Sequence, residues 1–310
     1  MKHVISVVLC LSVIVFGGIY VFFIGAPHEN PAVVQGGILR LWHIDSFEGG
    51  KGSRAAFLNR AAMQFEKKNE GVYIMVNTYT AEGASKAVAA GERPDLLSFS
   101  CGLDGAAELC RSLSTRFGGG EIGEKCYAYP WCGGEYFIFC LENDFSSLSA
   151  DTLLLSDGGE NLPWVAAALC GVTGNAPSED STSAYVHFLN GKYRYMLGTQ
   201  RDACRFQTRG VIVYSRPLTE YNDLFQYIAV TTPDEDALAA CEGFVSSLLS
   251  AETQQKLSDI GMKSAKDLTA RYTLSAFADK NAVRELREKG KNALVSGDIK
   301  ILKTYLKALN

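Results

Sequence analysis

The sequence has no excess of basic residues. Its 310 residues include 30 Lys and Arg against 34 Asp and Glu, which gives a formal net charge of −4. It also has no basic stripe interleaved with aromatic residues, so a strongly basic nucleic-acid binder is excluded. Internal repeats and low-complexity segments are absent as well. The composition is that of a globular protein, and its length suggests two domains or two lobes.

Catalytic and metal-binding motifs are also scarce. The chain has four histidines, and it contains no HExxH, no nucleophile elbow and no CxxC pair. Because the histidines do not cluster with its nine cysteines, we expect no zinc site and no other metal or cofactor. We also expect no catalytic residues. One enzymatic alternative stays open, a hydrolase or transferase that uses Cys132 with His187 and a carboxylate.

The first 37 residues differ from the rest of the chain. Residues 4–26 form a long apolar run, and about 20 apolar residues suffice to cross a bilayer. The run is longer than the apolar region of a signal peptide, so we favour an uncleaved membrane anchor over a cleaved signal. Residues 27–37 then form a linker. Either interpretation places the remaining chain on the extracytoplasmic face of the membrane.

Residues 38–68 read as a strand, a polar loop and a helix. The apolar run 38–44 is typical of a strand covered on both faces. Phe57, Ala61 and Phe65 recur every four residues after Ser53, which predicts an amphipathic helix with Ser53 as its N-cap.

The loop between this strand and helix, residues 45–52, predicts a ligand site. It is not a nucleotide P-loop, because Lys51 lies between glycines and no Ser or Thr follows it. In an open α/β sheet, however, a loop that leaves the carboxyl end of a strand is where ligands bind. The alternative interpretation is a flexible surface turn.

The next segments continue the alternation of strands and helices. Strands at 73–79 and 95–100 flank a helix at 80–91 that begins at Thr80. The resulting βαβαβ pattern implies a parallel sheet, in which the loops after the first and third strands lie side by side. An extended aromatic segment, 126–131, then precedes Gly133 and Gly134, which suits a hinge between two lobes.

The second half of the chain mixes strands with helices. Its long C-terminal tail, residues 265–310, reads as helical and amphipathic. The other predicted elements are helices at 162–170, 183–189 and 234–257, a helix that opens at 198–202, and strands at 135–141, 192–197, 211–214 and 225–230.

Several segments together resemble the extracellular solute-binding proteins of ABC importers, sugar-type family 1. The opening WHIDSFEGGKG and the helix FLNRAAMQFEKKN are similar to the first strand and helix of that family. GERPDLLSFS resembles its third strand, AYPWCGGEYFIFC its first crossover between lobes, and GKYRYMLGTQRDACRF its GKAAM strand. DALAACEGFVSSLLSAETQQKLSDIGMKSA resembles its C-terminal signature.

The resemblance implies an α/β fold, a type-2 periplasmic-binding-protein clamshell preceded by an N-terminal transmembrane helix. The chain is shorter than is usual in the family, so the second lobe is expected to be reduced. The implied first lobe comprises residues 38–131 and 226–262, and the second comprises residues 132–225 and 263–310.

The implied function is capture of a small solute between the lobes and its delivery to the permease subunits of an ABC importer. Aromatic and carboxylate side chains favour a carbohydrate, whereas Lys51 and Arg201 leave an anionic or phosphorylated solute open. A ligand-sensing ectodomain coupled to a membrane signalling partner is the alternative, because it needs the same clamshell.

The expected ligand contacts lie in the opening loop, at the crossover and at the helix that follows the GKAAM-like strand. For two of them, Trp42 and Trp131, the alternative role is packing in the core or hinge, and for Arg201 it is a surface network with Asp202. The candidate residues are Trp42, His43, Asp45, Ser46, Phe47, Glu48, Ser98, Ser100, Trp131, Tyr136, Thr199, Gln200 and Arg201.

Overall fold

The computed structural model describes residues 37–113, 119–159 and 161–309. The apolar run 4–26, which the sequence predicts to be a membrane anchor, lies outside these ranges. Within them, no helix combines the length and the apolar character that a bilayer-spanning segment needs.

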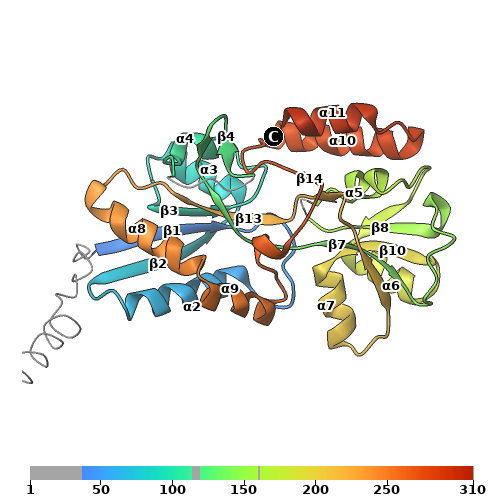
Figure 1. The fold of residues 1–310 in the computed structure, drawn as a ribbon, viewed down its shortest axis with the longest axis horizontal. Coiled ribbons are helices and arrows are strands. Elements are labelled where there is room, and N and C mark those ends of the chain that lie inside the picture. The colour runs from blue at the N-terminus through green and yellow to red at the C-terminus, as the bar shows by residue number, and fades with distance from the viewer. Residues whose placement is uncertain (1–36, 114–118, 160, 310) are drawn as a thin grey trace, which may run out of the picture.

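The first lobe is built on a five-stranded mixed sheet. Its strands, from one edge to the other, are β2 (Val72–Tyr79), β1 (Gly37–Ile44), β3 (Leu96–Phe99), β13 (Phe225–Val230) and β6 (Tyr129–Gly133). β1 is parallel to β2 and β3, as the βαβαβ pattern predicts, whereas β13 is antiparallel to β3 and β6. The carboxyl ends of the three parallel strands therefore meet at one edge of the sheet (Figure 1).

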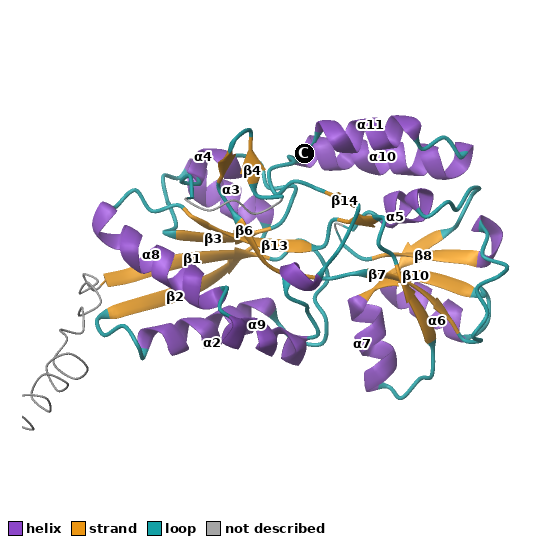
Figure 2. Ribbon diagram, in the orientation of Figure 1, coloured by secondary structure: helices purple, strands orange, loops and turns teal. Residues whose placement is uncertain are grey.

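Helices cover both faces of this sheet. One face carries α2 (Arg54–Glu66), α8 (Glu235–Leu248), α9 (Ala251–Gln255) and η2 (Lys256–Ile260), and the other carries α3 (Ala81–Ala89) and α4 (Ala106–Leu109) (Figure 2). The predicted caps are confirmed, because Ser53 accepts a hydrogen bond from Ala56 N and Thr80 accepts one from Gly83 N. A short hairpin, β4 (Glu121–Ile122) and β5 (Lys125–Cys126), completes this lobe.

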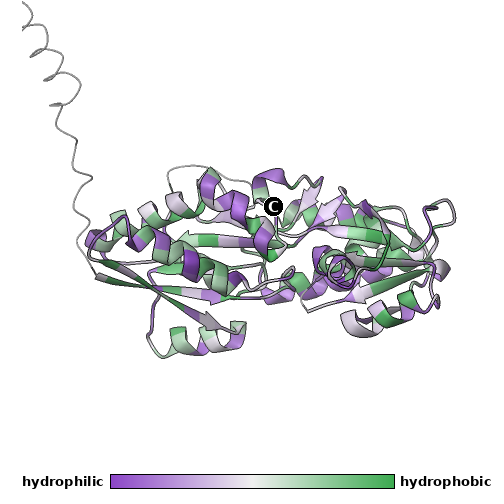
Figure 3. Ribbon diagram, turned by 90° about the horizontal axis from the view of Figure 1, so that it is seen from below, coloured by the Kyte–Doolittle hydropathy of each residue, from purple (hydrophilic) through white to green (hydrophobic). Residues whose placement is uncertain are grey.

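The second lobe contains the other five-stranded sheet. Its order is β11 (Tyr214–Pro217), β7 (Tyr136–Cys140), β10 (Tyr195–Thr199), β8 (Leu153–Asp157) and β9 (Ser178–Asp180). The helical elements are η1 (Ala150–Thr152), α5 (Pro163–Leu169), α6 (Ser181–Leu189) and α7 (Gln200–Thr208). Phe139, Phe188 and Phe206 form a core between the sheet and α6 and α7. The helices alternate hydrophilic and hydrophobic residues, as expected of helices with one face buried (Figure 3).

The chain passes between the lobes more than once. It leaves the first sheet after β6 and enters β7, and it returns from β11 through β12 (Tyr221–Asn222) to β13. After η2 it passes η3 (Ala265–Asp267) and β14 (Tyr272–Thr273), which pairs with β12. It ends in a helical hairpin, α10 (Lys280–Ser296) and α11 (Lys300–Ala308), which lies over the second lobe (Figure 1). The predicted two-lobed α/β architecture is confirmed.

The segment before α10 differs from the helical tail expected from the sequence. Leu268 and Ala276 pack in the core of the first lobe, and Ala276 N donates to Gly119 O. Apart from η3 and β14, the chain forms loops and turns here, since burial of these side chains outweighs helix propensity. The helix begins only at Lys280, after Asp279 caps it by accepting from Ala282 N.

Candidate solute-binding cleft

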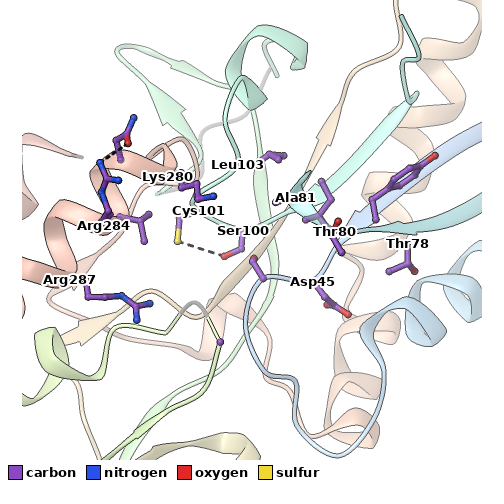
Figure 4. Close-up of a pocket in the computed structure, with 17 residues that line it drawn as sticks. Asp45, Thr78, Thr80, Ala81, Ser100, Cys101, Leu103, Lys280, Arg284 and Arg287 are labelled. Atoms are coloured by element: carbon purple, nitrogen blue, oxygen red, sulfur yellow. Dashed lines mark hydrogen bonds between the residues drawn. The ribbon is translucent and has the colours of Figure 1, made fainter. Parts of the chain in front are cut away.

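A cavity of about 840 Å³ lies between the two lobes. Its first wall is the edge of the first sheet where β1, β2 and β3 end, and its second wall is α10 (Figure 4). α10 belongs with the second lobe, because its helix packs against α5, where Gly290 lies close to Val165. The lining consists of residues 44–46, 78–81, 100–103, Gly159, Lys280, Asn281, Val283, Arg284 and Arg287.

Asp45, the residue that follows β1, presents a carboxylate to this cavity. Its Oδ1 accepts from His43 Nε2 at 2.8 Å and from Arg54 Nε at 2.8 Å. Partial burial raises the pKa of Asp45, but the hydrogen bond from His43 and the charge of Arg54 outweigh it and hold the pKa at about 2. The side chain stays 43% exposed. Asp45 is thus a fixed, ionised acceptor.

A buried network holds Asp45 from behind. Ser98 Oγ lies 3.0 Å from His43 Nδ1, 3.1 Å from Trp131 Nε1 and 3.2 Å from Gln226 Nε2. The Trp131 and Gln226 nitrogens are donors, so the Ser98 hydroxyl donates to His43 Nδ1. His43 then carries its proton on Nε2 and donates it to Asp45. These side chains orient the carboxylate without reaching the cavity.

Hydroxyl groups continue the first wall. Ser46 and Ser100 lie at the ends of β1 and β3, and Thr78 and Thr80 lie at the end of β2. Ser46 Oγ is buried and has no hydrogen-bond partner among the described residues. A buried hydroxyl without a partner costs stability, so Ser46 is poised to bond a group that enters the cavity.

The loop after Ser46 bridges the lobes beside the cavity. Glu48 O accepts from Gln200 Nε2 at 3.1 Å, and the Glu48 carboxylate accepts from Ser181 Oγ at 3.0 Å and pairs with Arg201. Phe47 forms an isolated β-bridge with Gly159 of the second lobe. We call the group Glu48, Ser181, Gln200 and Arg201 the loop seam.

This chain is similar to known proteins in its fold but not in its sequence. No protein-family model and no curated protein matches the sequence. Solved structures do match: the sugar-binding protein MalE of Xanthomonas citri has a TM-score of 0.62 at 13% identity, over 88% of this chain and 96% of the other. The galacto-N-biose-/lacto-N-biose I-binding protein of Bifidobacterium longum has a TM-score of 0.60 at 12% identity, over 89% and 96%. A raffinose complex of the binding protein RafE has a TM-score of 0.55 at 15% identity, over 88% and 98%.

The chain has the fold of the two-lobed solute-binding proteins. The resemblance predicted from the sequence is confirmed at the level of the fold. The residues that the sequence predicts as ligand contacts lie in different parts of this fold. Asp45, Ser46 and Ser100 line the cavity, while Glu48, Gln200 and Arg201 form the loop seam.

The other predicted residues are buried. Trp42 packs on Tyr79 with ring centroids 4.6 Å apart, Trp131 stacks on Phe57 at 5.7 Å, and the Phe47 ring lies under the Arg54 guanidinium. They shape the solute-binding fold around the cavity instead of lining it.

Two further predicted residues also have local structural roles. Thr199 caps α7 by accepting from Arg201 N at 3.3 Å. Tyr136 donates to Asp223 Oδ1 at 2.8 Å and accepts from Leu162 N at 2.9 Å. Both side chains are buried, so neither lines the cavity.

The wall formed by α10 contains residues that the sequence reasoning missed. Lys280, Arg284 and Arg287 recur at intervals of four and three on a helix whose apolar stripe was recognised, and cations on the other face normally indicate a solvated surface. Arg54 was missed for a related reason. It follows the N-cap of α2 directly, yet its side chain is buried under the loop.

The arrangement does not support the cysteine-dependent alternative. Cys132 is completely buried, and burial raises the pKa of its thiol to about 12, so it is protonated near neutral pH. His187 lies on α6 in the other lobe, where it contacts Glu179. Nucleophile and base are therefore not assembled.

Proposed function

We propose that this protein captures a small solute, a carbohydrate, between its lobes outside the cytoplasm and delivers it to an ABC importer. The observation that carries the proposal is the cavity between the lobes, where an oriented carboxylate and an unpartnered hydroxyl meet. Its volume is within the range of about 300–1,000 Å³ that is typical of small-molecule sites. The names of the similar structures, which include sugar-binding and raffinose-binding proteins, support the choice of solute.

Binding by this arrangement requires no covalent step, and we propose that the protein is not an enzyme. The lobes close around the solute about the chain crossings, and the solute stabilises the closed state because both walls then contact it. A shift from mostly open to mostly closed needs a preference of about 10⁴-fold, or ~5.5 kcal/mol. Asp45 on one wall and α10 on the other supply contacts to both lobes at once.

The proposal includes two features beyond the fold itself. Residues 4–26 tether the protein to the extracytoplasmic face of the membrane, since the run is apolar and long enough to cross a bilayer. The second lobe is a reduced version of its counterpart in longer relatives, as the chain length suggests. The permease subunits of the importer are the protein partners.

A thermal-shift screen of the full chain tests the proposal. We expect a carbohydrate from a panel of mono- and oligosaccharides, sugar phosphates and amino acids to raise the melting temperature in proportion to the logarithm of its concentration. Asp45→Asn should weaken the shift, and Asp259→Asn on the distant η2 should leave it unchanged. A panel without any response, or a response that Asp45→Asn leaves intact, would contradict this function.

A further inference from the structure

One wall of the cavity is markedly cationic. Lys280, Arg284 and Arg287 all line the cavity from α10, and their spacing of four and three residues places them on one face of the helix. Figure 4 shows Lys280 reaching from α10 toward Ser100 and Cys101, while Arg287 extends its guanidinium below it. The opposite wall, in contrast, presents mainly hydroxyl groups.

Two of these cations have no acidic partner in the part of the chain that the structure describes. Arg284 donates only to the amide oxygen of Asn281, at 3.1 Å, and no ion pair involves Lys280. Nearby carboxylates are already bonded to the start of the helix: Asp104 accepts from Lys280 N at 3.0 Å, and Asp279 accepts from Ala282 N at 2.7 Å.

Arg287 has a different role. Its guanidinium lies 3.6 Å from Asp157 Oδ1, donates to Asn161 O at 3.2 Å and sits over the Trp164 ring. These contacts hold it in place, so it adds positive charge to the wall without being free to wrap around a ligand.

The facing wall does not neutralise this charge. Among the described lining residues, Asp45 is the only carboxylate, and it already pairs with the buried guanidinium of Arg54. Tyr79 is the only aromatic residue among them, and it packs on Trp42. The lining therefore offers little aromatic surface on which a neutral sugar could stack. It does offer positive charge, from Lys280 and Arg284, that could bind an anion.

We propose that the solute is an acidic carbohydrate whose anionic group, a carboxylate or a phosphate, is held by Lys280 and Arg284. Asp45, Ser46 and Ser100 accept and donate hydrogen bonds to its hydroxyl groups. The inference rests on the proposed function and specifies the ligand class. Charge-assisted hydrogen bonds from Lys or Arg to carboxylate or phosphate are stronger than those between neutral groups. α10 packs on α5 of the second lobe, and its first residue, Lys280, is also bonded to Asp104 of the first lobe, so the anion would be held where the two lobes meet.

Calorimetric titration of the full chain with matched pairs of sugars tests this proposal. The probes are glucose with glucuronate and with glucose phosphate, and galactose with galacturonate. We expect at least one acid to bind about tenfold or more tightly than its neutral counterpart, with an affinity that falls as salt rises. The acid that binds best identifies the anion as a carboxylate or a phosphate.

Two charge-removing variants locate the anion. Lys280→Gln and Arg284→Gln change exposed side chains, so folding is preserved, and each should reduce the preference for the acid by about tenfold. Lys291→Gln is the control, since this lysine lies on the same helix, contacts Glu288 and does not line the cavity. It should leave the preference unchanged.

The outcomes separate the two proposals. A neutral sugar that binds as tightly as its acid, or an acid preference that survives both Lys280→Gln and Arg284→Gln, would overturn the acidic ligand and leave the sugar-binding function standing. If neither neutral nor acidic sugars bind, the proposed function fails, and the acidic ligand fails with it.

Discussion

The two places where the lobes face each other differ in how their polar groups are satisfied. At the loop seam, Glu48 meets Ser181, Gln200 and Arg201, so its charge and its carbonyl are bonded within the protein. Ser46 and Lys280 line opposite walls of the cavity. Among the described residues, the Ser46 hydroxyl has no hydrogen-bond partner and the Lys280 ammonium has no ion-pair partner. The seam thus joins the lobes by direct contacts, whereas these polar groups of the cavity are not bonded to the opposite lobe.

Replacement of Arg54 should have the largest effect on stability, because this side chain bonds both the cavity residue Asp45 and the backbone of the following loop. It is 2% exposed, donates to Asp45 and to Phe47 O, and lies over the Phe47 ring. We expect Arg54→Ala to lower the free energy of unfolding by about 2–4 kcal/mol, measured by urea denaturation.

Arg60→Ala is the matched control for Arg54→Ala. It removes an exposed arginine from the same helix, and we expect a change within about 0.5 kcal/mol. Equal losses in the two variants would show that Arg54 does not organise the loop. Solute binding should also be weakened in Arg54→Ala alone, because Asp45 loses the donor that fixes it.

Between the lobes, Asp223 should make stability depend on pH. Burial raises its pKa to about 7, even though the hydrogen bond from Tyr136 opposes the shift. The unfolded carboxyl ionises near its ordinary pKa of 3.8, whereas the folded one keeps its proton to about pH 7. Its stabilising contribution is therefore complete below about pH 4 and is lost as the pH rises to about 8.

The variant Asp223→Asn removes this titration. We expect its free energy of unfolding, relative to the natural protein, to rise between about pH 4 and pH 8 by an amount on the order of a few kcal/mol. Urea denaturation of both proteins at several pH values provides the measurement. A difference that stays constant over this range would show that Asp223 is ionised in the folded protein.

Gly50 lies where the loop 45–52 approaches the backbone of Ile260 and Gly261 closely. A Cβ here would lie 2.3 Å from Gly261 O and 2.5 Å from Ile260 O, and both are backbone atoms. We expect Gly50→Ala to lower the free energy of unfolding by about 1–3 kcal/mol, because the backbone must shift. Gly37→Ala, which meets nothing within 4 Å, is the control. Equal melting temperatures for the two variants would contradict the close approach.

The smallest effect is expected from the ion pair of the loop seam. Glu48→Gln and Arg201→Gln should each cost less than about 1 kcal/mol, because the pair is partly exposed to solvent. A double-mutant cycle measures the coupling. The same cycle on Glu82 and Lys86, a well exposed pair on α3, should give a smaller coupling. If the two couplings are equal, the seam does not hold the lobes together more firmly than a surface pair.

The sequence predicts the first wall better than the second because the two depend on different information. The strand and helix around residues 45–52 follow from local periodicity and the Ser53 cap. Parallel pairing then places the ends of β1 and β3 together, so Asp45, Ser46 and Ser100 could be predicted to lie close to one another.

The second wall depends on tertiary packing. Lys280 and Arg284 look like the solvated face of an amphipathic helix until α10 is placed over the cavity. The roles of aromatic residues also depend on tertiary packing. A tryptophan such as Trp131 looks the same in a sequence whether it is buried in the core or contacts a ligand. β8 was not predicted at all, because a short apolar run does not separate a strand from a buried helix.

The hairpin of α10 and α11 follows every strand of the two large sheets in the chain. A polypeptide that stopped at Asp279 would retain every strand of both large sheets, and it would lack the basic wall altogether.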